Sequence, residues 1–529
     1  MRQTRIVVAA SAIIFAFFFF VYSLTLRGVP TGGDAWGMYL VTASLAEDGD
    51  VFLAPSDRVV LRKGPGESWV SKYGIGQSLA QLPAYLFADV VSSGAKNIEP
   101  TLVKYFIVSF TNAAISSGVC VLVFLLCLAL GYGRGTSLYV VALAGFGAML
   151  WPQSKTLFSE PLQTLCLTGG FSFAMSWRAR GGKARAAAAG FLLGLLCATK
   201  PVMAAAAAPV VVYFVDGIRV KKNFLKEAPS ICFFFGFLVI WTVWVLYYNH
   251  IRFGDVFDFG YLGGADRDGI HGFNTPLLVG LHGFILSSGK GLVFYAPVAA
   301  LSILGYKPMA KRFGAEAATI VAISIAAAVA CAKWNAWHGD YSWGPRFMGP
   351  VVPLLAIMFG AALKSEGARA SSAMKAVAAA VFAVSLFVNM LGVFVNENEF
   401  ILMTKRHPAF GLPYVNAGAE LRDDLLNVHY IPEYSPLAGH WWILKNMVFR
   451  GGTTDAELSD RMRDDFPWRN LSPAIQPTNA ARAALPDAWW HYLPAFYPLT
   501  SSWVAPLAWS FLACAVFLAI SLAVIVARK

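Results

Sequence analysis

Long apolar runs separated by short polar stretches dominate this chain, and each run predicts a membrane-spanning helix. A helix needs about 20 mostly apolar residues to cross a hydrocarbon core of about 30 Å. About a dozen runs approach that length, so the predicted fold class is an all-α polytopic membrane protein. The expected spans are 6–26, 104–130, 137–152, 158–177, 186–200, 202–218, 229–249, 290–306, 314–332, 346–363, 376–395 and 503–526. The runs within 186–218 also fit one bent helix broken at Lys200-Pro201, because proline removes a helical donor.

The first apolar run differs from a cleaved secretory signal. It covers 6–24 behind Arg2 and Arg5, which is longer than the apolar core of a signal peptide. It ends in the bulky residues Tyr22 and Leu24, whereas a cleavage site needs small residues. We therefore expect an uncleaved first span.

Basic residues gather in short clusters between the apolar runs, and these clusters predict the orientation of the chain. They lie at 178–185, 219–226 and 307–312. Because cytoplasmic loops carry an excess of Lys and Arg, we expect these clusters and both termini in the cytoplasm. Most of the 30 acidic residues then fall on the external side. Acids contribute little to orientation, so this skew indicates external chemistry.

The composition supports a membrane protein and argues against a nucleic-acid binder. Hydrophobic residues make up 57% of the chain and charged residues 14%, whereas soluble domains carry about 25% charged residues. The net charge of +12 is spread over short loop clusters instead of one basic face of a compact domain. All seven cysteines lie inside or at the ends of apolar segments, which is typical of small buried side chains and not of zinc or redox sites.

Two polar stretches are long enough to form structure outside the membrane. The first, 27–103, contains the apolar segment 78–91, which we expect to lie as a helix in the outer interface. The second, 396–502, has mixed polarity and is rich in Pro and Trp. The predicted domains are a transmembrane catalytic module over 1–395, the external mixed region 396–502, and a last transmembrane helix with a cytoplasmic tail over 503–529.

Two acidic residues at the outer ends of predicted spans are candidates for catalysis on the external side. Asp34 follows two glycines just beyond the first span and precedes a stretch that is typical of a helix along the membrane surface. Its carboxylate fits either a general base or a simple cap of that helix. Glu160 lies at the outer end of the span 158–177. An ionisable residue at that depth is functional or paired, and Lys155 is the nearest candidate partner.

Cations at the outer ends of predicted spans run against the positive-inside bias. Lys72, Lys200, Lys290 and Arg346 all lie at such places. A lone lysine there only extends its ammonium towards the lipid headgroups. Together, however, these cations favour an anionic ligand, and a lipid phosphate is available at that depth. Tyr73 follows Lys72 directly and is a candidate contact for a sugar or an acceptor.

The segment 334–350, WNAWHGDYSWGPRFMGP, mixes aromatic and polar residues. An aromatic belt at the membrane surface accounts for Trp337 and Trp343 but not for His338 and Asp340. Aromatic faces beside polar hydrogen-bonding groups suit sugar rings, so these four residues are candidate contacts for a sugar or an acceptor. A His–Asp metal pair also fits, although two spaced ligands alone rarely define a metal site.

Stretches of the chain between residues 32 and 346 resemble the GT-C glycosyltransferases. They are most similar to bacterial members related to the protein O-mannosyltransferases and the lipid A aminoarabinose transferase. The stretches are GDAWGMYLVTASLAEDGDVFL, SKYGIGQSLAQLPAYL, TLFSEPLQTL, YYNHIRFGDVFDFGY, LSSGKGLVFYAP and WNAWHGDYSWGPR. The resemblance implies a GT-C-like bundle with interfacial helices in the first external loop, and it does not extend to 396–502.

The resemblance also implies roles for individual residues. By position, Asp34 matches the acid of the first external loop, which is the proposed base, and Glu160 matches the second acid. Lys72 and Arg346 match phosphate-contacting cations. Many relatives carry two adjacent acids in that loop, whereas Ala35 follows Asp34 here. A divalent metal therefore lacks its paired-acid motif, and no other cofactor is implied.

The implied activity is inverting transfer of a sugar from a polyprenyl-phosphate donor to a lipid, glycan or protein acceptor. The expected location is the external face of a bacterial inner membrane, with donor, acceptor and membrane lipids as partners and no nucleic acid. The alternatives are a flippase for a lipid-linked sugar, an O-antigen-ligase-type enzyme with a diphosphate-linked donor, and a structural scaffold. Many transporters show a pair of corresponding halves, and this sequence shows none. It also has no Rossmann or P-loop fingerprint.

Overall fold

The computed structural model describes residues 2–94, 98–222, 224–261, 272–339, 342–363, 371–397, 400, 429–430, 432, 435–448 and 486–527. It confirms the predicted class, an all-α polytopic membrane protein. The principal helices are α1 (Arg2–Leu24), α2 (Gly33–Glu47), α3 (Gly76–Gly94), α4 (Pro100–Ala129), α5 (Arg134–Gly147), α6 (Leu150–Ser154), α7 (Glu160–Arg180), α8 (Lys183–Thr199), α9 (Ala204–Lys221), α10 (Phe224–Phe253), α11 (Leu277–Leu286), α12 (Leu292–Tyr295), α13 (Pro297–Leu301), α14 (Ile303–Ala310), α15 (Gly314–Ala332), α16 (Val352–Leu363), α17 (Ser372–Phe394), α20 (Pro436–Ile443), α23 (Trp489–Phe496) and α24 (Ser501–Ala527).

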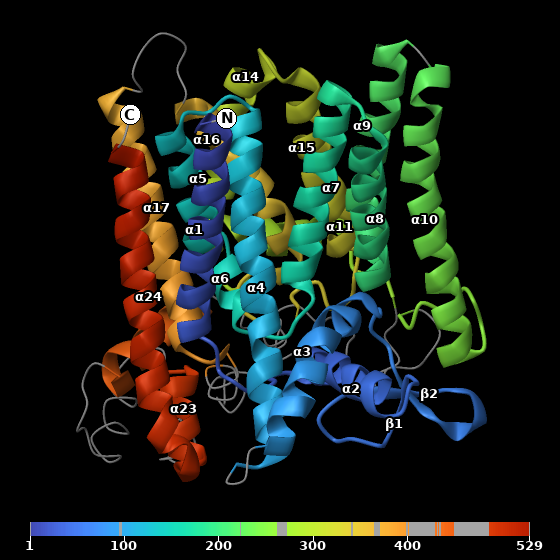
Figure 1. Cartoon of the computed structure of the whole chain (residues 1–529), viewed down its shortest axis with the longest axis vertical. Helices are drawn as coiled ribbons and strands as arrows, with labels where there is room; N and C mark the ends of the chain where they lie inside the picture. The colour runs from blue at the N-terminus through green and yellow to red at the C-terminus, as the bar shows by residue number, and fades with distance from the viewer. Residues whose placement is uncertain are drawn as a thin grey trace.

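Among the described residues, eight helices are long and apolar enough to cross a membrane. They include α1, α4, α9, α10, α15, α17 and α24, and α16 together with the 3-10 helix η3 (Arg346–Val351) that leads into it. Helices α5, α7 and α8 belong to the same bundle (Figure 1). In the most apolar 18-residue stretch of each segment, 89% of the residues are buried from η3 through α16, whereas 6% are buried in α24 and 11% in α10. Helix α16 therefore lies at the centre of the bundle, and α10 and α24 lie at its periphery.

The span predicted at 290–306 differs from the structure, whereas the two spans predicted within 186–218 are both present. The run 290–306 forms three short helices, α12 to α14, which break at Ala296-Pro297 and at Ser302. Lys200 adopts an extended conformation (φ −151°, ψ 102°) and is followed by the 3-10 helix η2 (Pro201–Met203). Residues 186–218 are therefore two separate helices, α8 and α9, and the alternative of one bent helix is wrong.

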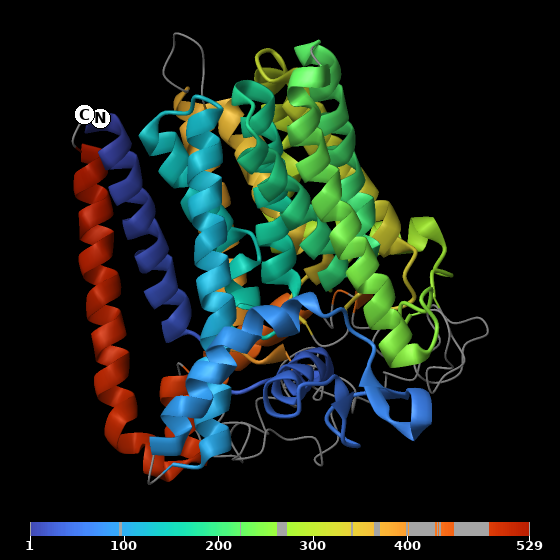
Figure 2. The same ribbon diagram turned by 45° about the vertical axis from the view of Figure 1, so that its right-hand side comes forward.

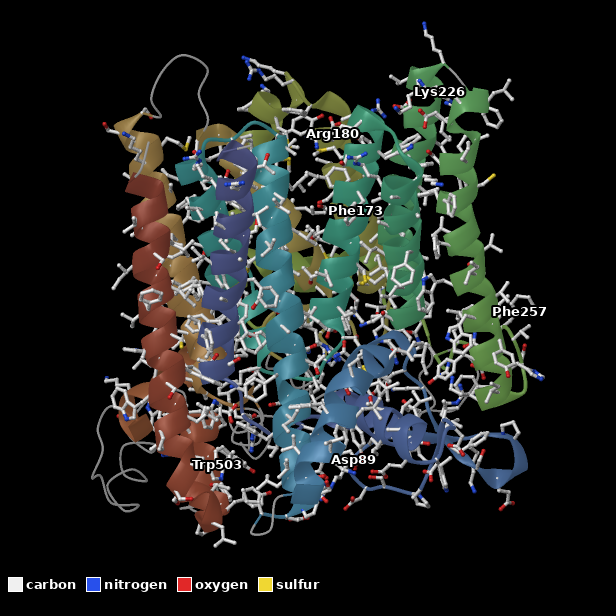
Figure 3. All side chains as sticks on the ribbon, in the orientation of Figure 1. Asp89, Phe173, Arg180, Lys226, Phe257 and Trp503 are labelled. Carbon is white, nitrogen blue, oxygen red and sulfur yellow. The ribbon has the colours of Figure 1, made fainter. Side chains whose placement is uncertain are left out.

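The two ends of the bundle differ in charge, as the orientation argument requires. Arg180 and Lys226, from two of the basic clusters, lie at the end where α1 begins and α24 ends (Figure 3). Asp89, from the first long loop, lies at the opposite end together with Trp503 (Figure 3). The predicted cytoplasmic clusters and both termini thus share one end, and the first long loop covers the other.

The first long loop folds under the bundle as two helices and a small sheet. Helix α2 crosses beneath the spans, and α3 leans against α4 (Figures 1 and 2). Helix α3 includes the predicted interfacial segment 78–91 and continues through Pro83. Strands β1 (Phe52–Leu53), β3 (Trp69–Ser71) and β2 (Leu61–Lys63) pair antiparallel in that order. The sheet was not predicted, because these strands are too short to give an alternating pattern.

The segment that precedes α24 is fixed to the same end of the bundle by a buried ion pair. Lys155, just after α6, donates to the Asp487 carboxylate at 2.6 Å and to the Val393 carbonyl at 2.6 Å. The Trp489 amide donates to the Leu26 carbonyl at 2.6 Å. Much of the predicted external region 396–502 lies outside the described residues.

Candidate active site

A cavity of about 940 Å³ opens at the end of the bundle that the first long loop covers. Its walls come from α2, the loop before α3, the start of α7, the ends of α8 and α15, the middle of α10, and η3. The ionisable and polar residues that the sequence analysis singled out on this wall are Asp34, Lys72, Tyr73, Glu160, Lys200, His338 and Arg346. Residues that are far apart in the sequence therefore face one space.

Asp34 faces the cavity because a glycine turn aims the start of α2 at it. Gly32 precedes the helix with φ +81°, a conformation that favours glycine, and a Cβ there would lie only 3.1 Å from the Phe158 ring. The Tyr73 hydroxyl donates to Asp34 Oδ1 at 2.6 Å, and Arg346 Nη2 donates to Oδ2 at 2.7 Å. No side chain caps the N-terminus of α2. The carboxylate thus engages the site and does not cap the helix.

The surroundings of Asp34 fix its charge. Burial raises the pKa of its carboxyl, but the charge of Arg346 and the hydrogen bonds from Tyr73 and Arg346 outweigh burial and lower that pKa to about 2. In this arrangement Asp34 is a carboxylate, and it is a weak base for as long as both partners hold it. Burial and the Asp34 charge raise the pKa of Tyr73, so its hydroxyl remains a donor.

Tyr73 and Lys72 are held by close backbone packing. A Cβ at Gly37 would lie 2.8 Å from the Tyr73 ring, and one at Gly74 would lie 2.3 Å from the Ala198 carbonyl. Arg252, near the end of α10, donates to the carbonyls of Ser71 and Tyr73 at 2.8 and 3.0 Å. This segment is therefore clamped between α2, α8 and α10, which places Lys72 and Tyr73 at the cavity wall.

Glu160 is the first residue of α7 and is 2% exposed. Its Oε1 lies 3.7 Å from Lys200 Nζ and 3.8 Å from Arg346 Nε. Its Oε2 accepts no hydrogen bond from any residue that the structure describes. Lys155, the candidate partner from the sequence, pairs instead with Asp487 at 2.6 Å. The alternative of a Lys155–Glu160 pair is therefore wrong, because Lys155 points to the segment that precedes α24.

Arg346 occupies the centre of the charged group. Its side chain is 6% exposed, and its guanidinium lies 4.7 Å from the centre of the Phe158 ring and 4.9 Å from that of Phe347. Lys200 Nζ lies 3.5 Å from the centre of the Phe347 ring. Aromatic faces stabilise cations that have lost water. These rings therefore keep two cations beside two carboxylates in a poorly hydrated space.

One side of the cavity is apolar and faces the periphery of the bundle. Leu238, Trp241, Val245 and Leu246 of α10 line it, and a Cβ at Gly194 of α8 would lie 2.4 Å from the Trp241 ring. Glycine thus lets α10 approach α8 closely. The opposite face of α10 exposes large apolar side chains at Val239, Ile240, Val243 and Trp244. The apolar side of the cavity is therefore separated from the lipid region by the peripheral α10 layer.

A second cavity, of about 440 Å³, adjoins the first on the side of the long loop. The two cavities share Val60, Lys72, Tyr261 and Trp334 as lining residues. The second also includes Arg58, Arg62 and Trp69. The shared residues make a common wall between an inner chamber and an outer vestibule.

The remaining predicted site residues lie in different places. Lys290 is fully buried, and its ammonium donates to the Ser342 carbonyl. Trp337 packs against Phe284 and Tyr430, and Trp343 packs against Tyr295 and His440. None of Lys290, Trp337 and Trp343 lines the cavity, whereas His338 does. Asp340 lies outside the described residues.

The sequence analysis missed several residues that shape the site. Phe158 and Phe347 flank the guanidinium of Arg346; each stands within two residues of a predicted site residue, but a Phe in an apolar run carries no distinguishing signal. Tyr261 and Trp334 line both cavities. Arg252, in the stretch YYNHIRF, was visible as a cation at the outer end of a predicted span.

Within the described ranges, no three His, Cys, Asp or Glu side chains are grouped so that they could hold a metal ion. The two acids of the site are instead linked through Arg346. Among the described residues of the cavity wall, the groups available for chemistry include two carboxylates, three cations and the Tyr73 hydroxyl.

Comparisons with known proteins give structural similarity only. No family model matches the sequence, and no curated protein matches it. Two crystal structures of ArnT from Cupriavidus metallidurans are similar to this chain. The one bound to undecaprenyl phosphate is 12% identical with a TM-score of 0.45, and coverage is 76% of this chain and 70% of ArnT. The apo structure is 15% identical with a TM-score of 0.46, and coverage is 76% and 71%.

Both TM-scores lie below 0.5, so this likeness carries no argument about the family of this chain. At these identities the likeness says nothing of this chain's donor or acceptor.

Proposed function

We propose that this chain is an inverting glycosyltransferase that uses a sugar linked to a polyprenyl phosphate. The observation that carries the proposal is the shape and charge of one cavity. Asp34, Glu160 and three cations, Lys72, Lys200 and Arg346, face a space whose other side is apolar and lies against the peripheral α10. A ligand with a phosphate head and a long hydrocarbon tail matches both halves of that space.

The donor phosphate belongs among the cations. Lys72, Lys200 and Arg346 line the chamber from three different segments, and Arg346 offers a planar fork that suits phosphate oxygens. When the bond from the anomeric carbon to the phosphate oxygen breaks, its electron pair stays on that oxygen, so negative charge grows there. Fixed cations in a poorly hydrated site stabilise that charge in the transition state.

The acceptor belongs on the opposite side of the sugar. An acceptor hydroxyl or amine attacks the anomeric carbon from the face away from the phosphate, and its proton passes to the Asp34 carboxylate. Glu160, whose Oε2 accepts no hydrogen bond from the described residues, orients the acceptor. The vestibule that shares Lys72, Tyr261 and Trp334 with the chamber offers a route from the aqueous side. His338 and Tyr73 line the chamber as contacts for sugar or acceptor.

Loss of the gene tests the transferase against the flippase. We expect cells without it to lose one glycan modification of the envelope and to accumulate the polyprenyl-phosphate sugar on the outer leaflet. Mass spectrometry of envelope glycans and leaflet-specific labelling of the lipid-linked sugar measure both. Accumulation on the inner leaflet alone would instead identify a flippase, and unchanged glycans and lipids would contradict both activities.

The proposal places the site on the external face of a bacterial inner membrane, with both termini in the cytoplasm. Asp57 is exposed in the first loop, and Lys226 is exposed at the opposite end of the bundle. We expect Asp57→Cys to react with a membrane-impermeant maleimide in cells whose outer membrane alone is opened. Lys226→Cys should react only after the inner membrane is opened as well. The wild-type chain gives the background, because Cys232 is exposed too; the reverse labelling pattern would invert the topology.

A further inference from the structure

The ions of the chamber neutralise one another in the structure. Arg346 donates to Asp34 at 2.7 Å and lies 3.8 Å from Glu160, and Lys200 lies 3.7 Å from Glu160. Two buried or half-buried carboxylates thus face two cations. Asp34, the base of the proposed reaction, and Arg346, the main phosphate ligand, are bound to each other. Neither can do its full task while this pair is closed.

We propose that the donor phosphate and Asp34 compete for Arg346, so that donor binding itself releases the base. This inference rests on the proposed function and adds an order to it: the donor binds before the acceptor proton passes to Asp34. In the first step the phosphate enters beside Lys72. Arg346 then turns from Asp34 Oδ2 to a phosphate oxygen, and Asp34 keeps the hydrogen bond from Tyr73.

The geometry supports each step of this exchange. Among the described residues, Lys72 forms no hydrogen bond or ion pair, and its ammonium lies 5.8 Å from the Tyr73 ring. It is therefore available as a first contact for phosphate. The guanidinium of Arg346 lies over both the Phe158 and the Phe347 ring, 4.7 and 4.9 Å from their centres, and these rings stabilise the cation while it changes partners. The Tyr73 hydroxyl holds Asp34 Oδ1 at 2.6 Å, so the carboxylate stays in place after Arg346 leaves.

The exchange also accounts for the weak basicity of Asp34 in the closed pair. The charge and the hydrogen bond of Arg346 help to lower the pKa of Asp34 to about 2. Transfer of that cation to a phosphate removes a large part of the effect, so the pKa of Asp34 rises when the donor is bound. The base is then stronger only in the presence of a donor, which prevents acceptor activation in an empty site.

Binding of undecaprenyl phosphate to the purified full-length protein in lipid nanodiscs tests the competition. We expect Asp34→Asn, which keeps the shape and removes the competing charge, to bind undecaprenyl phosphate about three- to tenfold more tightly than the wild type does. Glu160→Gln, whose carboxylate lies farther from Arg346, should tighten binding less, by about twofold. Glu47→Gln is the matched control and should leave the affinity for undecaprenyl phosphate unchanged, since Glu47 pairs with Lys104 outside the chamber.

The outcomes separate this inference from the proposed function. Undecaprenol, which lacks the phosphate, should bind weakly to every variant. If the wild type binds undecaprenyl phosphate no better than undecaprenol, the proposed donor is wrong. If the wild type prefers the phosphate but Asp34→Asn binds it equally well or more weakly, the competition is wrong and the donor assignment stands. Should Asp34→Asn fail to fold, unchanged or weaker binding by Glu160→Gln overturns the competition.

A second measurement uses the wild type alone. The pH dependence of kcat/KM for the donor reports groups of the free enzyme, and that of kcat reports groups of the donor complex. Because Asp34 acts as a carboxylate, the rate falls as the pH drops through its pKa. The charged and titratable groups that face Asp34 are Tyr73, Arg346, Lys72, Tyr261, Lys200 and Glu160, with His338 on the same wall. We expect the acidic limb of the kcat profile to lie at least one pH unit above the acidic limb of the kcat/KM profile. The same separation should appear in His338→Gln, which removes the histidine from the wall. Acidic limbs that coincide in both proteins would contradict the exchange.

Discussion

Asp34→Asn should reduce sugar transfer by about two to four orders of magnitude, the usual contribution of a general base. The substitution keeps the size of the side chain and an oxygen that can accept from the Tyr73 hydroxyl, which lies 2.6 Å from the carboxylate. It removes the group that takes the acceptor proton. The measurement is kcat with saturating donor, together with the thermal stability of the purified variant.

Glu47→Gln and Asp50→Asn are the controls for this loss. Both acids lie in the same loop, but Glu47 pairs with Lys104 at 2.7 Å and Asp50 accepts from Ser44 at 2.7 Å. Neither lines the cavity, so both variants should retain activity. If Asp34→Asn keeps near-normal turnover while either control variant loses it, the base is another acid of the loop.

Arg346→Lys should damage transfer nearly as much as Arg346→Ala, with a loss of about two to three orders of magnitude in each. Lysine keeps the charge, but it cannot replace the planar fork that reaches both a carboxylate and a phosphate. Its ammonium would also lose the contacts that the guanidinium makes with the Phe158 and Phe347 rings. Because Arg346 binds the phosphate in the ground state and also stabilises the charge that grows on it in the transition state, KM for the donor should rise while kcat falls.

Lys72→Arg is the matched comparison for the Arg346 variants. Lys72 acts as a point charge at the chamber wall, so an arginine there should keep activity within about tenfold of the wild type. Nearly normal activity of Arg346→Lys, or a larger loss in Lys72→Arg, would reverse the roles assigned to these two cations.

The sequence predicted the helices of the bundle well because apolar length is a strong signal. The predicted ranges 104–130 and 314–332 correspond to α4 (Pro100–Ala129) and α15 (Gly314–Ala332). The signal fails where tertiary packing decides the conformation. The run 290–306 is mostly apolar, but its break at Ala296-Pro297 divides it into short helices.

The site was predicted in part, for a similar reason. Asp34, Glu160 and Arg346 lie at the outer ends of predicted segments, so their common level in the membrane could be inferred from span boundaries. Their pairing could not, because it depends on how η3 turns towards α2. Lys290 lies at a similar level in the sequence pattern, yet its ammonium points to Ser342 within the protein. Hydropathy gives the depth of a residue and leaves its direction undefined.

The buried pair of Lys155 with Asp487 has a consequence for biosynthesis. Its two residues are 332 positions apart, so Lys155 is made long before its partner leaves the ribosome. A buried charge without its partner costs several kcal/mol, about 3–5 when one side of a pair is removed. Gln153 of α6, two residues before Lys155, donates to the Arg346 carbonyl at 3.2 Å. We therefore expect the Gln153 contact with Arg346 to take its final form only after Asp487 has been translated, so that shorter chains hold an incomplete active site.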